Sequence, residues 1–398
     1  AGQHYTDGRI DLHTQSDTLY ADASVRRGSE GGKPLDLSVH AAASDNDLHT
    51  LVAFDNHGNA RALHGSVSAN TVFLKDDDGQ WTVHVTVHES DIHVGNTSWT
   101  VLPSDIIYSK EQLVIDHFSL NNADQYITVG GKIRHDHADS LQVDIHQVDL
   151  TYMSSLLNAR NVEFGGLATG RGYVTSLFDQ PTAACDLYVD RFTFAGGTFG
   201  DLSARVGWKK NDGRIAIDAI ADNGPDSKTY ISGGILLSPT AFDLNLDTRG
   251  TKIDFLERYC GSFLCDIGAH VHGHLHLLGT FKEPNIEGQV VANGDVGVKS
   301  LRTVYTMVND TMLFTPDHIY FPGETLLDRD GQTARLAGKV DHQHFGNWTY
   351  DLGIHADRML VYDHRDYGGN TFCGTVYATG DCQIRGRSGE VVIDVNAT

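Results

Sequence analysis

The chain has 398 residues and a formal net charge of -22, from 52 acidic and 30 basic side chains. This balance argues against nucleic acid as a partner, since phosphates are bound by clustered Lys and Arg, and against broad docking onto anionic headgroups. The 42 glycines and the short alternating segments rich in Val, Ile, Thr, Tyr and Phe predict an all-β protein with many turns. No segment has the roughly 18 apolar residues of a membrane span, and no signal peptide is visible at the start. The chain opens directly into strand-like residues, so we expect a fragment of a larger protein.

The first part of the chain, from His4 to His64, alternates apolar and polar residues, and 56–59 is a predicted hairpin turn. The next predicted strand, 81–88, places Trp81 and three valines on one face and threonines and histidines on the other. Three later segments then share one pattern, namely a strand, a polar turn, a strand and a glycine. They are 118–133 with Gly131, 220–236 with Gly234, and 321–340 with Gly338.

A second pattern is centred on 269–290, a strand with a glycine, a turn at Pro284 and a second strand. Its first strand alternates three apolar residues with four histidines, a period of two that predicts one apolar and one polar face. Related segments at 164–187 and 372–395 place Gly170 and Gly380 at the position of Gly273, although the last copy lacks the proline. The candidate floor of the apolar face consists of Val174, Val271, Leu275, Leu277 and Val376.

Two sets of glycines with one period indicate tandem units of about 105 residues. The approximate units are 1–117, 118–219, 220–320 and 321–398, which run without a linker as one continuous segment. Because a flat sheet would leave the apolar face in water, we expect an elongated, curled, U-shaped β-groove. Two short segments, 150–158 and 252–260, each have one apolar stripe and are predicted to be small helical plugs on the strands.

Motifs for chemistry are weak. His270, His272, His274 and His276 share one strand face at i, i+2 spacing, which makes them candidate zinc or copper ligands, but solvent-facing histidines are the favoured interpretation. The acidic turn 328–331 lacks the acid that a calcium loop needs at its twelfth position. No nucleophile, metalloprotease or phosphate-loop motif is complete. We therefore expect no catalytic residues, no cofactor and no enzymatic activity.

The five cysteines are odd in number and contain no CxxC pair, which disfavours a structural zinc site. Cys260 and Cys265 are close enough in sequence to bridge a short loop. Free, partly buried thiols are the favoured interpretation, and the disulfide remains the alternative.

The last third of the chain resembles the TamB family, the translocation and assembly module of the wider AsmA-like group. The resemblance lies in the order of LHLLGTFKEPNIEGQVVANGDVGV at 275–298, Tyr305, LFTPDHIYF at 313–321, DGQTARLAGKVD at 330–341 and the segment 371–393. It covers about the last 130 residues, with weaker copies back to about Phe118. Residues before Val101 match only generically.

The resemblance implies a long β-groove with an apolar floor, in a periplasmic protein anchored in the inner membrane by an N-terminal helix. It implies phospholipid as the ligand, an outer-membrane barrel of the Omp85 class, similar to TamA, as the partner, and no catalytic residues. The predicted function is a lipid conduit between the two membranes. Two alternatives remain open: a scaffold that assembles outer-membrane barrels by strand addition, and a β-solenoid adhesin or glycan-binding module.

Overall fold

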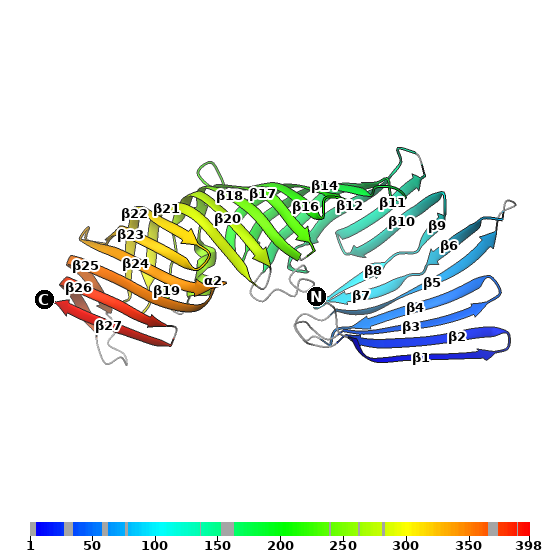
Figure 1. The fold of residues 1–398 in the computed structure, drawn as a ribbon, viewed down its shortest axis with the longest axis horizontal. Coiled ribbons are helices and arrows are strands. Elements are labelled where there is room, and N and C mark those ends of the chain that lie inside the picture. Colours follow the sequence, from blue (N-terminus) through cyan, green and yellow to red (C-terminus); the bar gives the residue numbers. More distant parts are fainter. Residues whose placement is uncertain are drawn as a thin grey trace. The chain divides into compact units, whose positions relative to one another are not determined.

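The computed structural model describes residues 5–27, 35–57, 63–75, 79–135, 137–152, 163–238, 240–261, 263–280, 283–364, 373–387 and 389–398. Over these residues the chain forms antiparallel β-sheet with 27 strands, and its helical elements are very short (Figure 1). The predicted all-β fold class is confirmed. The hairpin predicted at 56–59 lies partly outside the described residues, as do most of 150–158 and the start of the copy at 372–395.

Contacts divide the chain into two compact units. Unit 1 comprises 1–160, 164–190 and 205–215, and unit 2 comprises 161–163, 191–204 and 216–398. The strands up to the shared β14 and β15 are β1 (Tyr5–Gln15), β2 (Thr18–Arg27), β3 (Leu35–Ser44), β4 (Asp47–Asp55), β5 (Leu63–Lys75), β6 (Trp81–Val87), β7 (Ser90–Val94), β8 (Thr97–Val101), β9 (Ser104–Ser109), β10 (Gln112–Asn122), β11 (Gln125–Arg134), β12 (Ser140–Asp149), β13 (Phe164–Thr175), β14 (Thr182–Phe194) and β15 (Gly197–Lys209). The remaining elements are β16 (Arg214–Asp222), β17 (Lys228–Leu237), β18 (Thr240–Lys252), the 3-10 turn η1 (Asp254–Leu256), α2 (Glu257–Cys260), β19 (Leu264–Cys265), β20 (His270–Thr280), β21 (Pro284–Val298), β22 (Thr303–Thr315), β23 (His318–Leu327), β24 (Thr333–Gln343), β25 (Gly346–His364), β26 (Gly374–Arg387) and β27 (Glu390–Ala397).

In unit 1 the sheet runs from β1 to β5 by successive antiparallel pairing. The long strand β5 then pairs with β6 along one half and with β7 along the other. Strands β8 and β9 continue these two branches, and both pair with β10, which leads through β11 and β12 to β13. The predicted strand at 81–88 is therefore β6, and the hairpin predicted at 118–133 is formed by β10 and β11.

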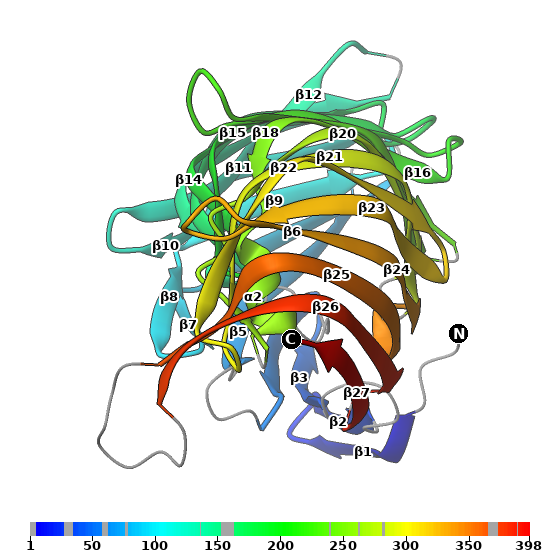
Figure 2. The same ribbon diagram turned by 90° about the vertical axis from the view of Figure 1, so that its left-hand side faces the viewer.

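In unit 2 the strands pair in sequence from β17 through β18 to β20 and then to β27, and β19 adds to one end of β21. Figure 2 shows these strands curving around α2. The strand hairpins predicted at 220–236 and 321–340 are confirmed as β16–β17 and β23–β24. In the predicted plug at 252–260, Lys252 is the last residue of β18 and the helical turns begin at Asp254.

Most of the recurring glycines occupy positions where the backbone excludes a side chain, although Gly170 lacks a positive φ. Gly273 has a φ of +152°, and a Cβ at this position would lie 2.2 Å from the carbonyl oxygen of Gln289 on the next strand. Gly338 and Gly380 have the same left-handed backbone and the same conflict. Gly233, rather than the predicted Gly234, takes this role in its unit, with a φ of +135°. Only glycine fits such corners, because a side chain would collide with the neighbouring backbone.

Candidate functional site

The antiparallel register sorts the side chains of the first strands of unit 1 into two faces. Leu37, Val39, Val52 and Phe54 of β3 and β4 lie opposite one another, and β5 continues the row with Val67. We call this surface the apolar face. It comprises the side chains on this side of β3, β4 and β6, which are Leu37, Val39, Ala41, Ala43, Leu48, Thr50, Val52, Phe54, Val83, Val85 and Val87.

This part of the apolar face is not covered by the protein's own side chains. Among the described residues from Thr6 to Thr86, the single buried residue is Asn56, whose position is at the end of β4. The valines and leucines of the face are half-buried, except Val87 at the end of β6, which is 5% exposed. None of the residues that define the face in β3, β4 and β6 is charged. An uncharged, uncovered row of this kind is a candidate binding surface for an apolar ligand.

The opposite surface, which we call the polar face, carries cross-strand pairs of aspartate with a basic side chain. Asp22 and His40 lie directly opposite each other on β2 and β3, with Oδ1 and Nδ1 2.5 Å apart. In unit 2, Asp381 pairs in the same way with His355 at 2.7 Å. These pairs place polar and charged side chains opposite one another on the polar face.

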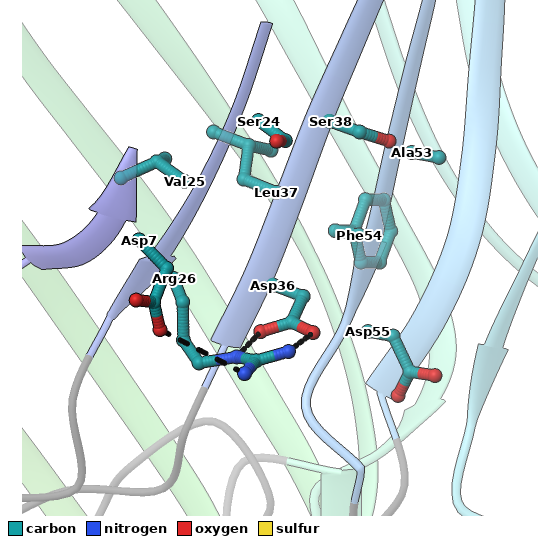
Figure 3. A pocket seen from close by; sticks show the side chains of 10 residues that line it. All are labelled: Asp7, Ser24, Val25, Arg26, Asp36, Leu37, Ser38, Ala53, Phe54 and Asp55. Carbon is teal, nitrogen blue, oxygen red and sulfur yellow. Dashed lines mark hydrogen bonds and ion pairs between the residues drawn. The ribbon is translucent and has the colours of Figure 1, made fainter. Parts of the chain in front are cut away.

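A shallow depression of about 390 Å³ lies at one end of β2, β3 and β4 (Figure 3). Arg26 donates two hydrogen bonds to Asp36, from Nε at 2.6 Å and from Nη2 at 2.7 Å, and the ring of His57 contacts the same carboxylate at 2.7 Å. Arg26 and His57 hold the pKa of Asp36 well below its usual range, and Asp36 raises the pKa of both bases. Because its charges already satisfy one another, we interpret this depression as a surface ion-pair network.

The five predicted floor residues fall in different surroundings. Val271 is 4% exposed and belongs to a buried core, against which Leu275 also packs. Leu277 and Val174 are half-buried. Val376, at 48% exposure, is open to solvent. Apolar positions that alternate in the same way therefore differ in how well they are covered, and strand alternation alone does not distinguish them.

A segment of the chain itself covers Val271. Ile253, Ile267 and Ala269 are buried together with Val271, Val290 and Ala292, and Phe255 and Leu256 of η1 pack against this core. A second core, around Tyr305, Ala334 and Met359, fills the next part of unit 2. There the Tyr305 hydroxyl donates to the backbone oxygen of Leu360 at 2.9 Å.

The candidate metal ligands His270, His272, His274 and His276 project from the polar side of β20. His274 contacts Asp247 at 3.1 Å and His276 contacts Asp243 at 2.7 Å, both across the strand pair with β18. Within the described residues, no group of three or more His, Cys, Asp or Glu side chains is arranged to hold a metal ion. Hydrogen bonding to aspartate accounts for the placement of these two histidines.

Asp310 and Glu324 were not predicted as functional residues. Both are buried on the apolar side of unit 2, at 3% and 5% exposure. Asp310 lies opposite Ala292 of β21, within the run of core residues that includes Val290 and Met312. An acid at an apolar position of an alternating strand was the available signal, and the register shifts in the flanking pairs β21–β22 and β23–β24 obscured it.

All five cysteines lie in the described residues and have free thiols, of which that of Cys373 is exposed. Burial raises the pKa of the Cys260 thiol. In the described part of the chain, no helix combines the length and the apolar character that a membrane span requires. The chain matches no protein-family model, no curated protein and no solved structure.

Proposed function

We propose that this chain is a lipid-conducting segment that holds phospholipid acyl chains on its apolar face. The observation that carries the proposal is the part of this face on β3, β4 and β6 where apolar side chains stand in rows and, apart from Val87 at one end, are only half-buried. A surface of this kind needs an apolar partner, since leaving it in water forfeits the free energy of burying it.

Acyl chains fit the chemistry of this surface. Each buried CH₂ contributes about 0.8 kcal/mol, so a chain of ordinary length is held without any directed polar contact. Because the rows contain no charge, successive positions along the sheet offer a sliding chain similar environments. The polar headgroup stays in water beyond the strand ends. Movement of the lipid along the sheet requires no catalytic side chain.

The location and partners follow from the family resemblance and belong to the proposal. The protein would act in the periplasm of a bacterium with two membranes, joined to the inner membrane by a segment outside this chain. Its partner would be an outer-membrane barrel of the Omp85 class. Its role would be the movement of phospholipid between the two membranes.

The test uses two neighbouring residues of β4 that face opposite sides. Val52 lies on the apolar face and Leu51 on the polar face, and both are half-buried. Val52→Asp places a carboxylate where an acyl chain would desolvate it, so the phospholipid that co-purifies with the chain, measured by mass spectrometry, should fall several-fold. Leu51→Asp is the matched control and should retain it.

Circular dichroism of both variants verifies that the β-sheet is intact. Equal lipid retention in the two variants would contradict the proposal. Capture of peptide strands in place of lipid by the wild-type chain would favour the assembly scaffold.

A further inference from the structure

The segment Ile253–Ala269 joins two strands that are already neighbours. Lys252, the last residue of β18, lies opposite His270, the first residue of β20, and the two strands pair along their length. A two-residue turn suffices to connect antiparallel strands that meet in this way. The whole segment, which we call the plug, is therefore an excursion that strand connection does not require.

The plug is seated on the apolar side of unit 2. Its residues Ile253, Ile267 and Ala269 are buried against Val271 and Val290 of β20 and β21. Phe255, Leu256 and Leu264 add to this contact, and the same core takes in residues of β22. Figure 2 shows α2 inside the curve of the strands. The plug thus covers apolar side chains of β20 and β21, whereas most of the apolar side chains of β3, β4 and β6 are only half-buried.

Polar contacts at the margin of the plug hold it in place. Arg258 of α2 donates two hydrogen bonds of 2.8 Å to the carboxylate of Glu163, a partly exposed pair. Glu257 accepts a hydrogen bond of 2.7 Å from the backbone N–H of Ile267, within the plug. Backbone pairing attaches the plug as well, because β19 lies opposite the end of β21 and the Gly268 N–H donates to the Asp295 carbonyl oxygen at 2.9 Å. Partly exposed ion pairs contribute little free energy, so the apolar contact and this short strand pairing supply most of the attachment. A ligand with an apolar chain can replace the apolar contact, and water would then satisfy the backbone groups that β19 and β21 release.

We propose that the plug is a displaceable internal occupant that gates the apolar face of unit 2, taking the place of an acyl chain until lipid replaces it. This inference rests on the proposed function. While the plug is seated, lipid is confined to the uncovered face of unit 1. Once it leaves, Val271 and Val290 become accessible to an acyl chain. Plug and lipid compete for one surface, and their relative affinities set the fraction of open chains.

Two variants fix the plug in opposite states. The open variant replaces Ile253–Ala269 with Asn-Gly, which joins Lys252 to His270 by a hairpin turn. The locked variant is Gly297→Cys in a chain whose other four native cysteines are serine. A Cβ at position 297 would lie 2.9 Å from the Cys265 Sγ, a separation that suits a disulfide between the plug and β21. It would also approach the Cys265 carbonyl oxygen at 2.7 Å, so formation of the disulfide is verified by mass. Reduction of the same protein is the matched control.

The probe is phosphatidylethanolamine with a photoreactive acyl chain, presented in vesicles of phosphatidylethanolamine and phosphatidylglycerol. Cross-linked peptides are assigned by mass spectrometry to β3–β6 or to β20–β22. We expect the oxidised locked variant to cross-link to lipid at β3–β6 alone. In the open variant, cross-linking at β20–β22 should increase several-fold over the wild type. Reduction should restore the wild-type level at β20–β22.

Equal labelling of β20–β22 in the open and locked variants, with β3–β6 labelled in both, would overturn the plug as a gate and leave the proposed function intact. Absence of labelling at both places in the open variant would overturn both. Labelling that appears at β20–β22 of the open variant alone would support the gate and overturn lipid binding on unit 1.

Discussion

Asp310 and Glu324 each accept a hydrogen bond from the backbone N–H that follows the other residue. Asp310 Oδ1 accepts from Thr325 at 2.9 Å, and Glu324 Oε2 accepts from Thr311 at 2.8 Å. Two carboxyl groups buried side by side cannot both ionise without a large free-energy cost. Burial, together with the neighbouring Asp310, raises the pKa of Glu324. The pair therefore retains a proton at a pH where exposed carboxyls have lost theirs.

This pair predicts a loss of stability as the pH rises. The folded chain binds the proton of Glu324 more tightly than the unfolded chain does, so the free energy of unfolding falls as the pH rises from the unfolded pKa to the raised folded pKa. Glu324→Gln removes that dependence, because the amide cannot ionise. Urea denaturation from weakly acidic to neutral pH measures the difference. Parallel pH profiles for the variant and the wild type would contradict a shared proton.

His342 predicts the opposite dependence. It is 2% exposed, its ring stacks on Phe345 at a centroid distance of 4.8 Å, and burial lowers its pKa. The unfolded chain therefore takes up this proton first as the pH falls, and stability is lost as the pH drops through the unfolded pKa towards the lowered folded value. His342→Phe should reduce the loss of unfolding free energy at acid pH. It should leave the dependence of that free energy on pH unchanged at higher pH. If the variant lost unfolding free energy at acid pH as steeply as the wild type, the loss could not be assigned to His342.

The glycine corners predict a marked cost for a single methyl group. Gly273→Ala places a Cβ 2.2 Å from a neighbouring carbonyl oxygen at a φ of +152°, and backbone strain of this kind costs about 1–3 kcal/mol. Gly207→Ala is the matched control, also within a strand, with no atom within 4 Å of its new Cβ. Thermal unfolding should separate the two variants. Equal melting temperatures would show that the corner tolerates a side chain.

The sequence predicted the elements of this fold because their signals are local. Alternation identified β6 and β20, and the recurring glycines identified the corners, with Gly233 displaced from Gly234 by one position within a Gly-Gly pair. Local sequence patterns could not predict which apolar side chains are covered by other parts of the chain. Nothing in the alternation around Val271 shows that Ile267 lies over it, since that contact depends on where the excursion folds back.

Lipid binding on the apolar face is tested most directly by a residue-by-residue scan of β4 with a photo-cross-linking amino acid, from Leu48 to Phe54, in living cells. Adjacent side chains of a strand point to opposite faces, so the account predicts phospholipid adducts at Leu48, Thr50, Val52 and Phe54. It predicts none at His49, Leu51 and Ala53. Adducts with lipid at every position, or at none, would contradict an acyl chain held on the apolar face.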